Sequence, residues 1–132
     1  MIVETAEQPR KRGHKQEEAR LQADCFRWCW NSYPETRRLL FHVENERTNS
    51  SMIDGARRRS MGLVAGVSDL ILLIPRGRWH GLCIEMKTIE GKQRDEQKLW
   101  QAAVESQGYR YELIRTKQSF QQLIEEYLAL PH

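Results

Sequence analysis

Apolar residues recur at intervals of three and four positions in three parts of the chain, and each part is predicted to be an amphipathic helix. The first pattern begins at Lys15 and ends where Asn31, Ser32 and Pro34 interrupt it. Its apolar side chains are Leu21, Cys25, Trp28 and Cys29. The other two expected helices cover residues 93–107 and 119–130.

Short apolar or alternating runs between these helices predict strands. The run at 67–74 is apolar except for Ser68 and Asp69, so we expect a central strand that is buried on both faces. The loop 75–78 is short enough to make this strand and the next one hairpin neighbours. The expected strands cover residues 39–43, 67–74, 79–88 and 109–115. This order of elements predicts an α/β fold with a mixed central sheet flanked by helices.

Length and composition place these elements in one domain. A chain of 132 residues, with 39% hydrophobic and 30% charged residues, has room for one core of normal size. Residues 1–14 are polar and mixed in charge, so we expect a flexible N-terminal tail before a single domain at 15–132. The longest apolar run, Leu70 to Pro75, is too short for a membrane span, and 3 cysteines argue against a disulfide framework. We therefore expect a cytoplasmic protein with no membrane partner.

Three charged residues stand in or beside runs that are otherwise apolar. Asp69 opens one expected strand, and Glu85 and Lys87 close the next one. A charge in such a place is costly unless it is paired or binds a metal. Because residues i and i+2 of a strand project from the same face, Glu85 and Lys87 converge and can face Asp69 on the neighbouring strand.

The spacing Glu-x-Lys is a weak signal by itself, because the chain contains other examples. Glu96 and Lys98 fall in an expected helix, where residues i and i+2 point apart. Glu90 and Lys92 flank a glycine turn and have no fixed relation. Only the pair that follows an apolar strand is expected to form a site.

Two interpretations of the Asp69, Glu85 and Lys87 trio are open. Two carboxylates offer the oxygen ligands that Mg²⁺ or Mn²⁺ prefers, and such a cation can acidify a bound water and neutralise charge on a phosphate. The lysine can then orient that water and stabilise the anion that forms on phosphorus. In the other interpretation, the three side chains form only a salt bridge at a sheet edge.

The sequence segments around Asp69, Glu85 and Lys87 favour the metal site over the salt bridge. They are Gly66-Val67-Ser68-Asp69-Leu70, Gly81-Leu82-Cys83-Ile84-Glu85-Met86-Lys87-Thr88, Gly91-Lys92, Glu96-Gln97-Lys98 and Gly108-Tyr109-Arg110. Together they resemble the VRR-NUC (virus-type replication-repair nuclease) family of the PD-(D/E)xK nuclease superfamily, over about residues 17–116. Ser68 stands where that family often has proline, a change that affects the stiffness of the turn.

The resemblance implies a restriction-endonuclease-like fold with an αβββαβ core. It also implies a Mg²⁺- or Mn²⁺-dependent endonuclease that hydrolyses DNA and uses no organic cofactor. Asp69, Glu85 and the backbone carbonyl of Met86 would hold the metal, and Lys87 would orient the attacking water. Gln97 would be a further active-site residue that holds the lysine or the water, although an exposed helix glutamine is the alternative.

The family also has an acidic residue on its first helix, and both Glu17 and Glu18 are candidates. Glu18 shares a helix face with Gln22, Cys25 and Cys29, so we choose Glu18 as a catalytic residue that binds the metal directly or through water. Either glutamate alternatively belongs to a solvated helix N-terminus, where acidic residues are favoured.

The implied partner is DNA. Small viral and bacterial members of the family act as homodimers on four-way junctions, so the resemblance implies a homodimer that cuts Holliday junctions or other branched DNA. The host would be a bacterial cell, with or without an infecting phage. Two other hypotheses remain: a nucleic-acid-binding module with this fold but no catalysis, and a small interaction protein whose buried charges are merely paired.

A formal net charge of +3 permits nucleic-acid binding but does not require it. The capping-box pattern Ser51-Met52-Ile53-Asp54 predicts a short helix with three consecutive arginines. Arginine side chains suit phosphate oxygens, although a run of charges can also be an ordinary solvated face. The residues expected to surround the mouth of the site and contact DNA are Asn45, Arg47, Arg57, Arg58, Arg59, Lys92 and Arg94.

Overall fold

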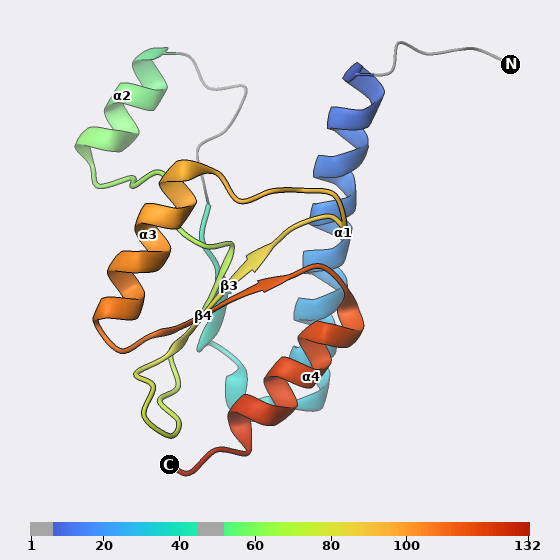
Figure 1. Ribbon diagram of the computed structural model, residues 1–132, viewed down its shortest axis with the longest axis vertical. Helices are drawn as coiled ribbons and strands as arrows, with labels where there is room; N and C mark the ends of the chain where they lie inside the picture. The colour runs from blue at the N-terminus through green and yellow to red at the C-terminus, as the bar shows by residue number, and fades with distance from the viewer. Residues whose placement is uncertain (1–6, 45–51) are drawn as a thin grey trace, which may run out of the picture.

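The computed structural model describes residues 7–44 and 52–132, which form helices around one sheet (Figure 1). The helices are α1 (Glu7–Ser32), α2 (Met52–Ser60), α3 (Asp95–Ser106) and α4 (Lys117–Leu128), with a short 3-10 helix η1 at Pro34–Thr36. The strands are β1 (Leu40–His42), β2 (Leu70–Leu72), β3 (Leu82–Met86) and β4 (Arg110–Ile114). The α/β class and the order of the elements agree with the sequence prediction.

The described residues build a mixed sheet of 4 strands in the order β1-β2-β3-β4. β1, β2 and β3 form an antiparallel meander, and Leu70 of β2 lies opposite Ile84 of β3. β4 is parallel to β3, and α3 makes the crossover between them. The expected hairpin relation of β2 and β3 is therefore confirmed.

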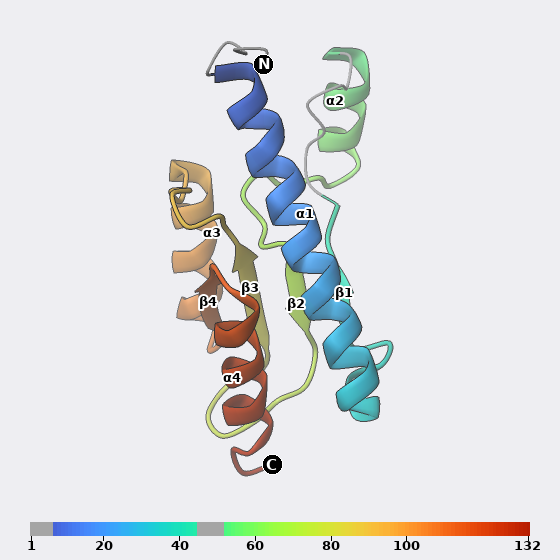
Figure 2. The same cartoon turned by 90° about the vertical axis from the view of Figure 1, so that its right-hand side faces the viewer.

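The two faces of the sheet are covered by different helices and differ in polarity. α1 and α4 cover one face, and α3 covers the other (Figure 2). From β3, Leu82, Ile84 and Met86 point into the hydrophobic core beneath α1 and α4. Each such side chain stabilises the fold by about 1.5–3 kcal/mol through removal of apolar surface from water. Because strand residues alternate, Cys83 and Glu85 point to the opposite face, which we call the α3 face.

Helix α1 begins earlier than predicted. Its first residue is Glu7 rather than Lys15, so the expected tail at 1–14 is wrong from residue 7 onward. Pro9 lies in the first turn of α1, where a backbone N–H has no partner within the helix, and proline is tolerated there. Residues 1–6 lie outside the described part of the chain.

The prediction for β2 was also partly wrong. Leu70 and Leu72 are buried, but Ile71 between them is only half-buried. The strand that is buried along its whole length is β3, because α3 packs over the β3–β4 side of the sheet and leaves β2 less covered. In residues 7–44 and 52–132, no helix is both long and apolar enough to cross a bilayer.

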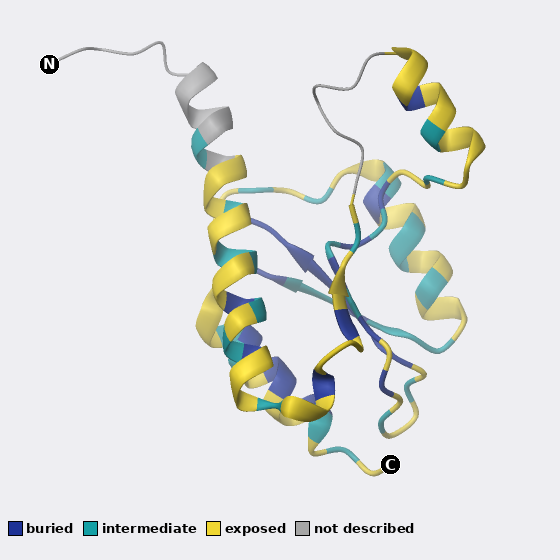
Figure 3. Cartoon of the chain, turned by 180° about the vertical axis from the view of Figure 1, so that it is seen from behind, coloured by how far each residue is buried: buried dark blue, intermediate teal, exposed yellow. Residues whose placement is uncertain are grey.

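Helix α2 stands apart from the sheet, near the end of the molecule where α3 begins (Figure 1). Most of its surface is exposed (Figure 3), and the side chain of Ile53 is 80% exposed. The short helix therefore occurs where it was predicted, although Ser51, the expected capping residue, lies outside the described residues.

Candidate active site

Asp69 and Glu85 face each other across two neighbouring strands. Continuing the β2–β3 register by one residue beyond the Leu70–Ile84 pair places Asp69 directly opposite Glu85. One carboxylate oxygen of Asp69, Oδ2, accepts a hydrogen bond from the backbone N–H of Met86 at 2.7 Å. This bond holds the Asp69 carboxyl at the end of β3, within hydrogen-bonding reach of the Glu85 carboxyl.

Glu85 is only 2% exposed, and both of its carboxylate oxygens have donors from the α3 face. The Gln97 side-chain amide donates to Oε2 at 2.9 Å. The Tyr111 hydroxyl lies 3.3 Å from Oε1 and donates to it. The carboxylate is thus held from α3 on one side and from β4 on the other.

The electrostatic environment of Glu85 favours its neutral form. Burial, together with the neighbouring carboxyl of Asp69, raises its pKa from 4.5 to about 9, although the charge of Lys87 and the Tyr111 hydrogen bond act in the opposite direction. Two carboxyl groups this close repel each other when both are ionised. A nearby cation removes that repulsion, so the pair offers a divalent metal a favourable position.

Lys87 follows β3 directly and is 8% exposed. Its backbone N–H donates to the carbonyl of Ile114 at 2.9 Å, which extends the β3–β4 pairing by one residue. Its charge lowers the pKa of Glu85, against the larger effects of burial and of the Asp69 carboxyl.

The segment after Lys87 is held by one arginine. Nη1 of Arg115 donates to the carbonyls of Thr88, Ile89 and Gly91 at 2.6, 3.1 and 2.6 Å. This clamp connects the end of β4 to the loop that leaves the site. The loop that follows Lys87 therefore has a defined path.

Gln97 is buried, with 4% exposure, and is not the exposed helix glutamine that was the alternative. Its Oε1 accepts a hydrogen bond from the backbone N–H of Arg94 at 2.7 Å, so the side chain caps α3 while its amide group reaches Glu85. Gly66 lies against this helix start with φ at 89°, and a Cβ there would lie 2.9 Å from the Gln97 backbone nitrogen. Glycine is required at this close approach.

Glu18 reaches the same end of the sheet from α1. Glu18, Asp69 and Met86 line one cavity of about 530 Å³ between α1 and the β1–β2 strands. Glu17 is exposed and lies outside the lining, so the geometry favours Glu18 as the helix acid. Within the part of the chain that the structure describes, no three His, Cys, Asp or Glu side chains form a metal-binding cluster. Glu18 therefore does not join Asp69 and Glu85 in a three-carboxylate group.

The basic residues expected to contact DNA divide into two groups. Arg57 and Arg59 are exposed on α2, Arg58 is partly buried there, and Lys92 and Arg94 are exposed near the start of α3. α2 and the start of α3 lie at the same end of the molecule (Figure 1). Asn45 and Arg47 lie outside the described residues.

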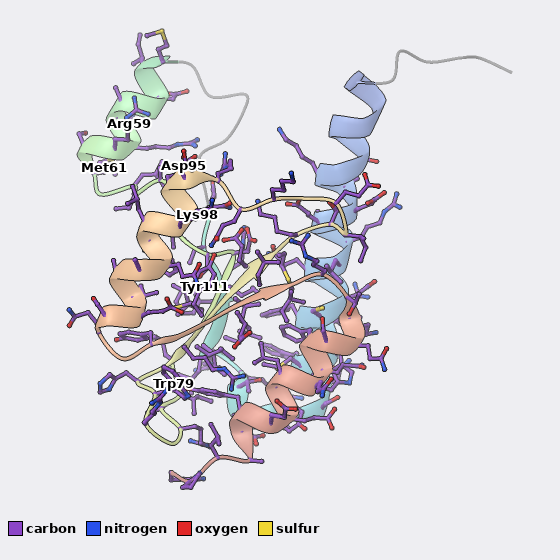
Figure 4. All side chains as sticks on the ribbon, viewed as in Figure 1. Arg59, Met61, Trp79, Asp95, Lys98 and Tyr111 are labelled. Carbon is purple, nitrogen blue, oxygen red and sulfur yellow. The ribbon has the colours of Figure 1, made fainter. Side chains whose placement is uncertain are left out.

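The sequence analysis missed two residues of the site, Tyr111 and Gln93. Figure 4 places Tyr111 between α3 and the sheet. Its hydroxyl contacts Glu85, and the Gln93 side-chain amide donates to that hydroxyl at 3.2 Å. Burial and the charge of Glu85 raise the pKa of Tyr111, so its hydroxyl keeps its proton at neutral pH. The only available signal was the alternation at 109–115, which predicts a strand but no hydrogen bond to a particular partner.

Comparison with known proteins identifies the family. The family model of the VRR-NUC domain matches residues 7–118. The chain belongs to the VRR-NUC domain family. A solved structure described as a VRR_NUC domain protein superposes with a TM-score of 0.76 at 24% identity, covering 87% of this chain and 90% of the other, and supports the fold. No curated protein matches the sequence.

Membership of the VRR-NUC family, a nuclease-type family, supports a nuclease or nucleic-acid-related role. The residues of this VRR-NUC domain also fit a hard divalent cation. Asp69 and Glu85 supply carboxylate oxygens at one point, and Mg²⁺ is commonly bound by one or two carboxylates together with waters. The pKa of Glu85 stays raised although the charge of Lys87 lowers it, because burial and the Asp69 carboxyl act more strongly in the other direction.

Proposed function

We propose that this VRR-NUC protein is a Mg²⁺- or Mn²⁺-dependent endonuclease that hydrolyses DNA phosphodiester bonds. One observation carries the proposal: Asp69 lies opposite Glu85, and Lys87 follows two residues after Glu85, just past the end of β3. Family membership supports it independently. A salt bridge alone would not require a second carboxyl group, Asp69, beside the buried Glu85.

In this proposal, Asp69, Glu85 and the backbone carbonyl of Met86 hold the cation, and Glu18, which lines the cavity beside Asp69, contributes from α1 through a water. When bound, the cation supplies an acidified water and neutralises charge on the scissile phosphate. Gln97 holds one oxygen of Glu85 in place.

The role of Lys87 follows from its position. The residue is buried and its charge acts on Glu85, in a part of the protein with little solvent, where electrostatic interactions are stronger than in water. There it orients the attacking water and stabilises the negative charge that develops on the phosphate. The basic side chains of α2 and of the α3 start guide the DNA backbone to this point.

We extend the proposal to four-way or otherwise branched DNA as the substrate and to a homodimer as the active form. The family resemblance supports both extensions. One site cuts one strand, so symmetric cutting of two strands requires a second copy of the chain. Sedimentation of the protein alone and with a four-way junction tests the dimer.

The decisive experiment compares cleavage of a labelled panel of duplex, flap, single-stranded and four-way DNA, with Mg²⁺ and with EDTA. We expect cleavage of the branched substrates only with Mg²⁺. Lys87→Ala is expected to lower the cleavage rate by about 100-fold or more while DNA binding persists. The matched control is Lys98→Ala, an exposed lysine in a Glu-x-Lys sequence on α3 (Figure 4), which should leave the rate unchanged.

Two results would contradict the proposal in different ways. Mg²⁺-dependent cleavage by Lys87→Ala at the wild-type rate would exclude the assigned role of the lysine. Binding of every substrate by the wild-type protein, without any cleavage, would identify a non-catalytic nucleic-acid-binding module with this fold.

A further inference from the structure

The α3 face contains a polar network that reaches Glu85 from the side opposite Asp69. Gln93, in the loop before α3, uses its side-chain nitrogen twice: it donates to the Tyr111 hydroxyl at 3.2 Å and to Oε1 of Gln101 at 2.7 Å. The Tyr111 hydroxyl in turn donates to Oε1 of Glu85 at 3.3 Å. The network therefore connects the α3 region to the carboxylate through Tyr111.

The direction of these hydrogen bonds is fixed. An amide nitrogen can only donate, so the Tyr111 oxygen must be the acceptor for Gln93. The single hydroxyl proton of Tyr111 then remains for Glu85. Because the second hydrogen of the Gln93 amide is taken by Gln101, that amide cannot turn away without losing two bonds.

The aromatic ring of Tyr111 is held independently of its hydroxyl. The residue is 7% exposed, and its ring meets the edge of the Trp100 ring at a centroid distance of 6.2 Å. The backbone of Tyr111 lies opposite Cys83 in the parallel β3–β4 pair. The hydroxyl group is thus presented to Glu85 from a rigid base.

We propose that Tyr111, oriented by Gln93, is a positioning residue that fixes the Glu85 carboxylate for a divalent cation. Gln97 holds Oε2 and Tyr111 holds Oε1, so rotation of the carboxylate about its terminal bond would break both hydrogen bonds. Without Tyr111, Oε1 loses its hydroxyl donor, while Gln97 still holds Oε2. The carboxylate then loses conformational freedom when it binds the metal, so the affinity for the metal falls. This inference rests on the proposed function, because it assigns Glu85 as a metal ligand.

The test measures Mn²⁺ binding to the metal-free protein by calorimetry, together with DNA binding in EDTA and the Mn²⁺ dependence of cleavage. Tyr111→Phe removes the hydroxyl and keeps the ring. Partners of metal ligands typically change metal affinity by about 10- to 100-fold when they are removed, so we expect Mn²⁺ affinity to fall by about tenfold. DNA affinity in EDTA should stay the same, and saturating Mn²⁺ should recover most of the cleavage rate.

Two further variants distinguish positioning from general loss of structure. Tyr109→Phe removes the hydroxyl of a neighbouring tyrosine whose ring contacts His80, and it should leave Mn²⁺ affinity unchanged. Gln93→Ala should weaken Mn²⁺ binding less than Tyr111→Phe does. The double variant should be no weaker than Tyr111→Phe alone, because Gln93 acts through the hydroxyl that is already missing.

The outcomes separate this inference from the proposed function. If wild-type protein binds Mn²⁺ and cleaves DNA while Tyr111→Phe binds Mn²⁺ equally well, the positioning role is wrong and the nuclease assignment stands. If Gln93→Ala and Tyr111→Phe weaken Mn²⁺ binding additively, Gln93 does not act through Tyr111. If wild-type protein neither binds Mn²⁺ nor cleaves any substrate, both proposals are overturned.

Discussion

Glu85 places a carboxyl group in a strand whose neighbouring residues are buried, next to a second carboxyl group. Such an arrangement is unfavourable for folding in the absence of a cation, since burial and the Asp69 charge both oppose ionisation of Glu85. The same arrangement favours binding of a divalent metal, because the charge of the cation offsets the repulsion between the two carboxylates. Stability and metal binding are therefore expected to change in opposite directions at this residue.

Replacement of Glu85 by glutamine should stabilise the metal-free protein and abolish cleavage. The amide keeps the shape of the side chain and removes the repulsion from Asp69. At pH 8 in EDTA we expect the free energy of unfolding to rise by about 1 kcal/mol, a shift of roughly 4 °C in the unfolding midpoint. Glu126→Gln, which changes an exposed glutamate of α4, should leave the midpoint unchanged. A lower midpoint for Glu85→Gln would contradict this interpretation.

The pH dependence of stability follows from the same shift. The folded-state pKa of Glu85 is raised, so the protein gains stability from its protonated form at low pH. This contribution is full below about pH 4.5 and is lost as pH rises toward about 9. In EDTA, the difference in unfolding free energy between Glu85→Gln and wild type should therefore grow with pH across this window. Denaturant unfolding at several pH values measures this difference in free energy. A difference that stays constant with pH would exclude ionisation of Glu85 as the source of the pH dependence.

Gly66 allows the segment before Asp69 to pass directly beneath the start of α3. Gly66→Ala adds left-handed backbone strain and a Cβ that overlaps the α3 backbone, so α3 and Gln97 must shift away from Glu85. We expect a loss of about 1–3 kcal/mol of stability and a lower cleavage rate. Gly62→Ala is the matched control, because Gly62 also has positive φ but no atom lies near its added Cβ. Equal effects of both substitutions on cleavage would show that the contact with α3 is unimportant.

The central residues of the site could be predicted from sequence because they violate a local pattern. Charges at Asp69, Glu85 and Lys87 interrupt apolar runs, and the alternation of strand residues places them together. Tyr111 and Gln93 violate no such pattern. A tyrosine in an alternating strand is ordinary, and its hydrogen bond to Glu85 exists only once β4 lies parallel to β3.

At the scale of elements, the clamp by Arg115 joins the end of β4 to the loop after Lys87. Arg115→Lys keeps the charge, but the lysine side chain is shorter, so its ammonium group cannot take the position of Nη1 near the three carbonyls. We expect about tenfold slower cleavage with DNA binding retained, because the path of the chain after Lys87 loosens. Arg27→Lys, at an exposed position on α1, is the control that should not change the rate. Unchanged cleavage by Arg115→Lys would show that Lys87 is positioned by β3 alone.

The elements themselves were predictable in order and type, and less so in extent. Among the described residues, periodicity predicted α1, α3, α4 and the strands, and the capping-box pattern predicted α2. Periodicity placed the start of α1 too late, because Pro9 and the mixed charges at 7–14 lack an apolar stripe, whereas a helix can extend beyond the part that packs. It also predicted burial of β2 on both faces, where Ile71 is only half-buried, since an apolar run does not reveal which strand a helix such as α3 will cover.

At the scale of the whole molecule, α2 presents arginines at the end where α3 begins (Figure 1). The double variant Arg57→Ala/Arg59→Ala should weaken DNA binding at low salt and reduce the slope of log affinity against log salt by about 2, one for each lost phosphate contact. Mn²⁺ affinity should not change. Arg27→Ala/Arg78→Ala removes the same charge elsewhere and should have a smaller effect. Equal salt slopes for both double variants would assign DNA attraction to net charge rather than to α2.

Successive residues of β3 point to opposite faces of the sheet. Ile84 and Met86 lie in the hydrophobic core, and Glu85 between them faces α3. An insertion or deletion of one residue in this strand would turn Glu85 into the apolar interior and send Ile84 toward the polar network. Folding would fail together with catalysis. For that reason we expect length changes in this lineage to accumulate in the connecting loops, while the spacing along β3 stays invariant.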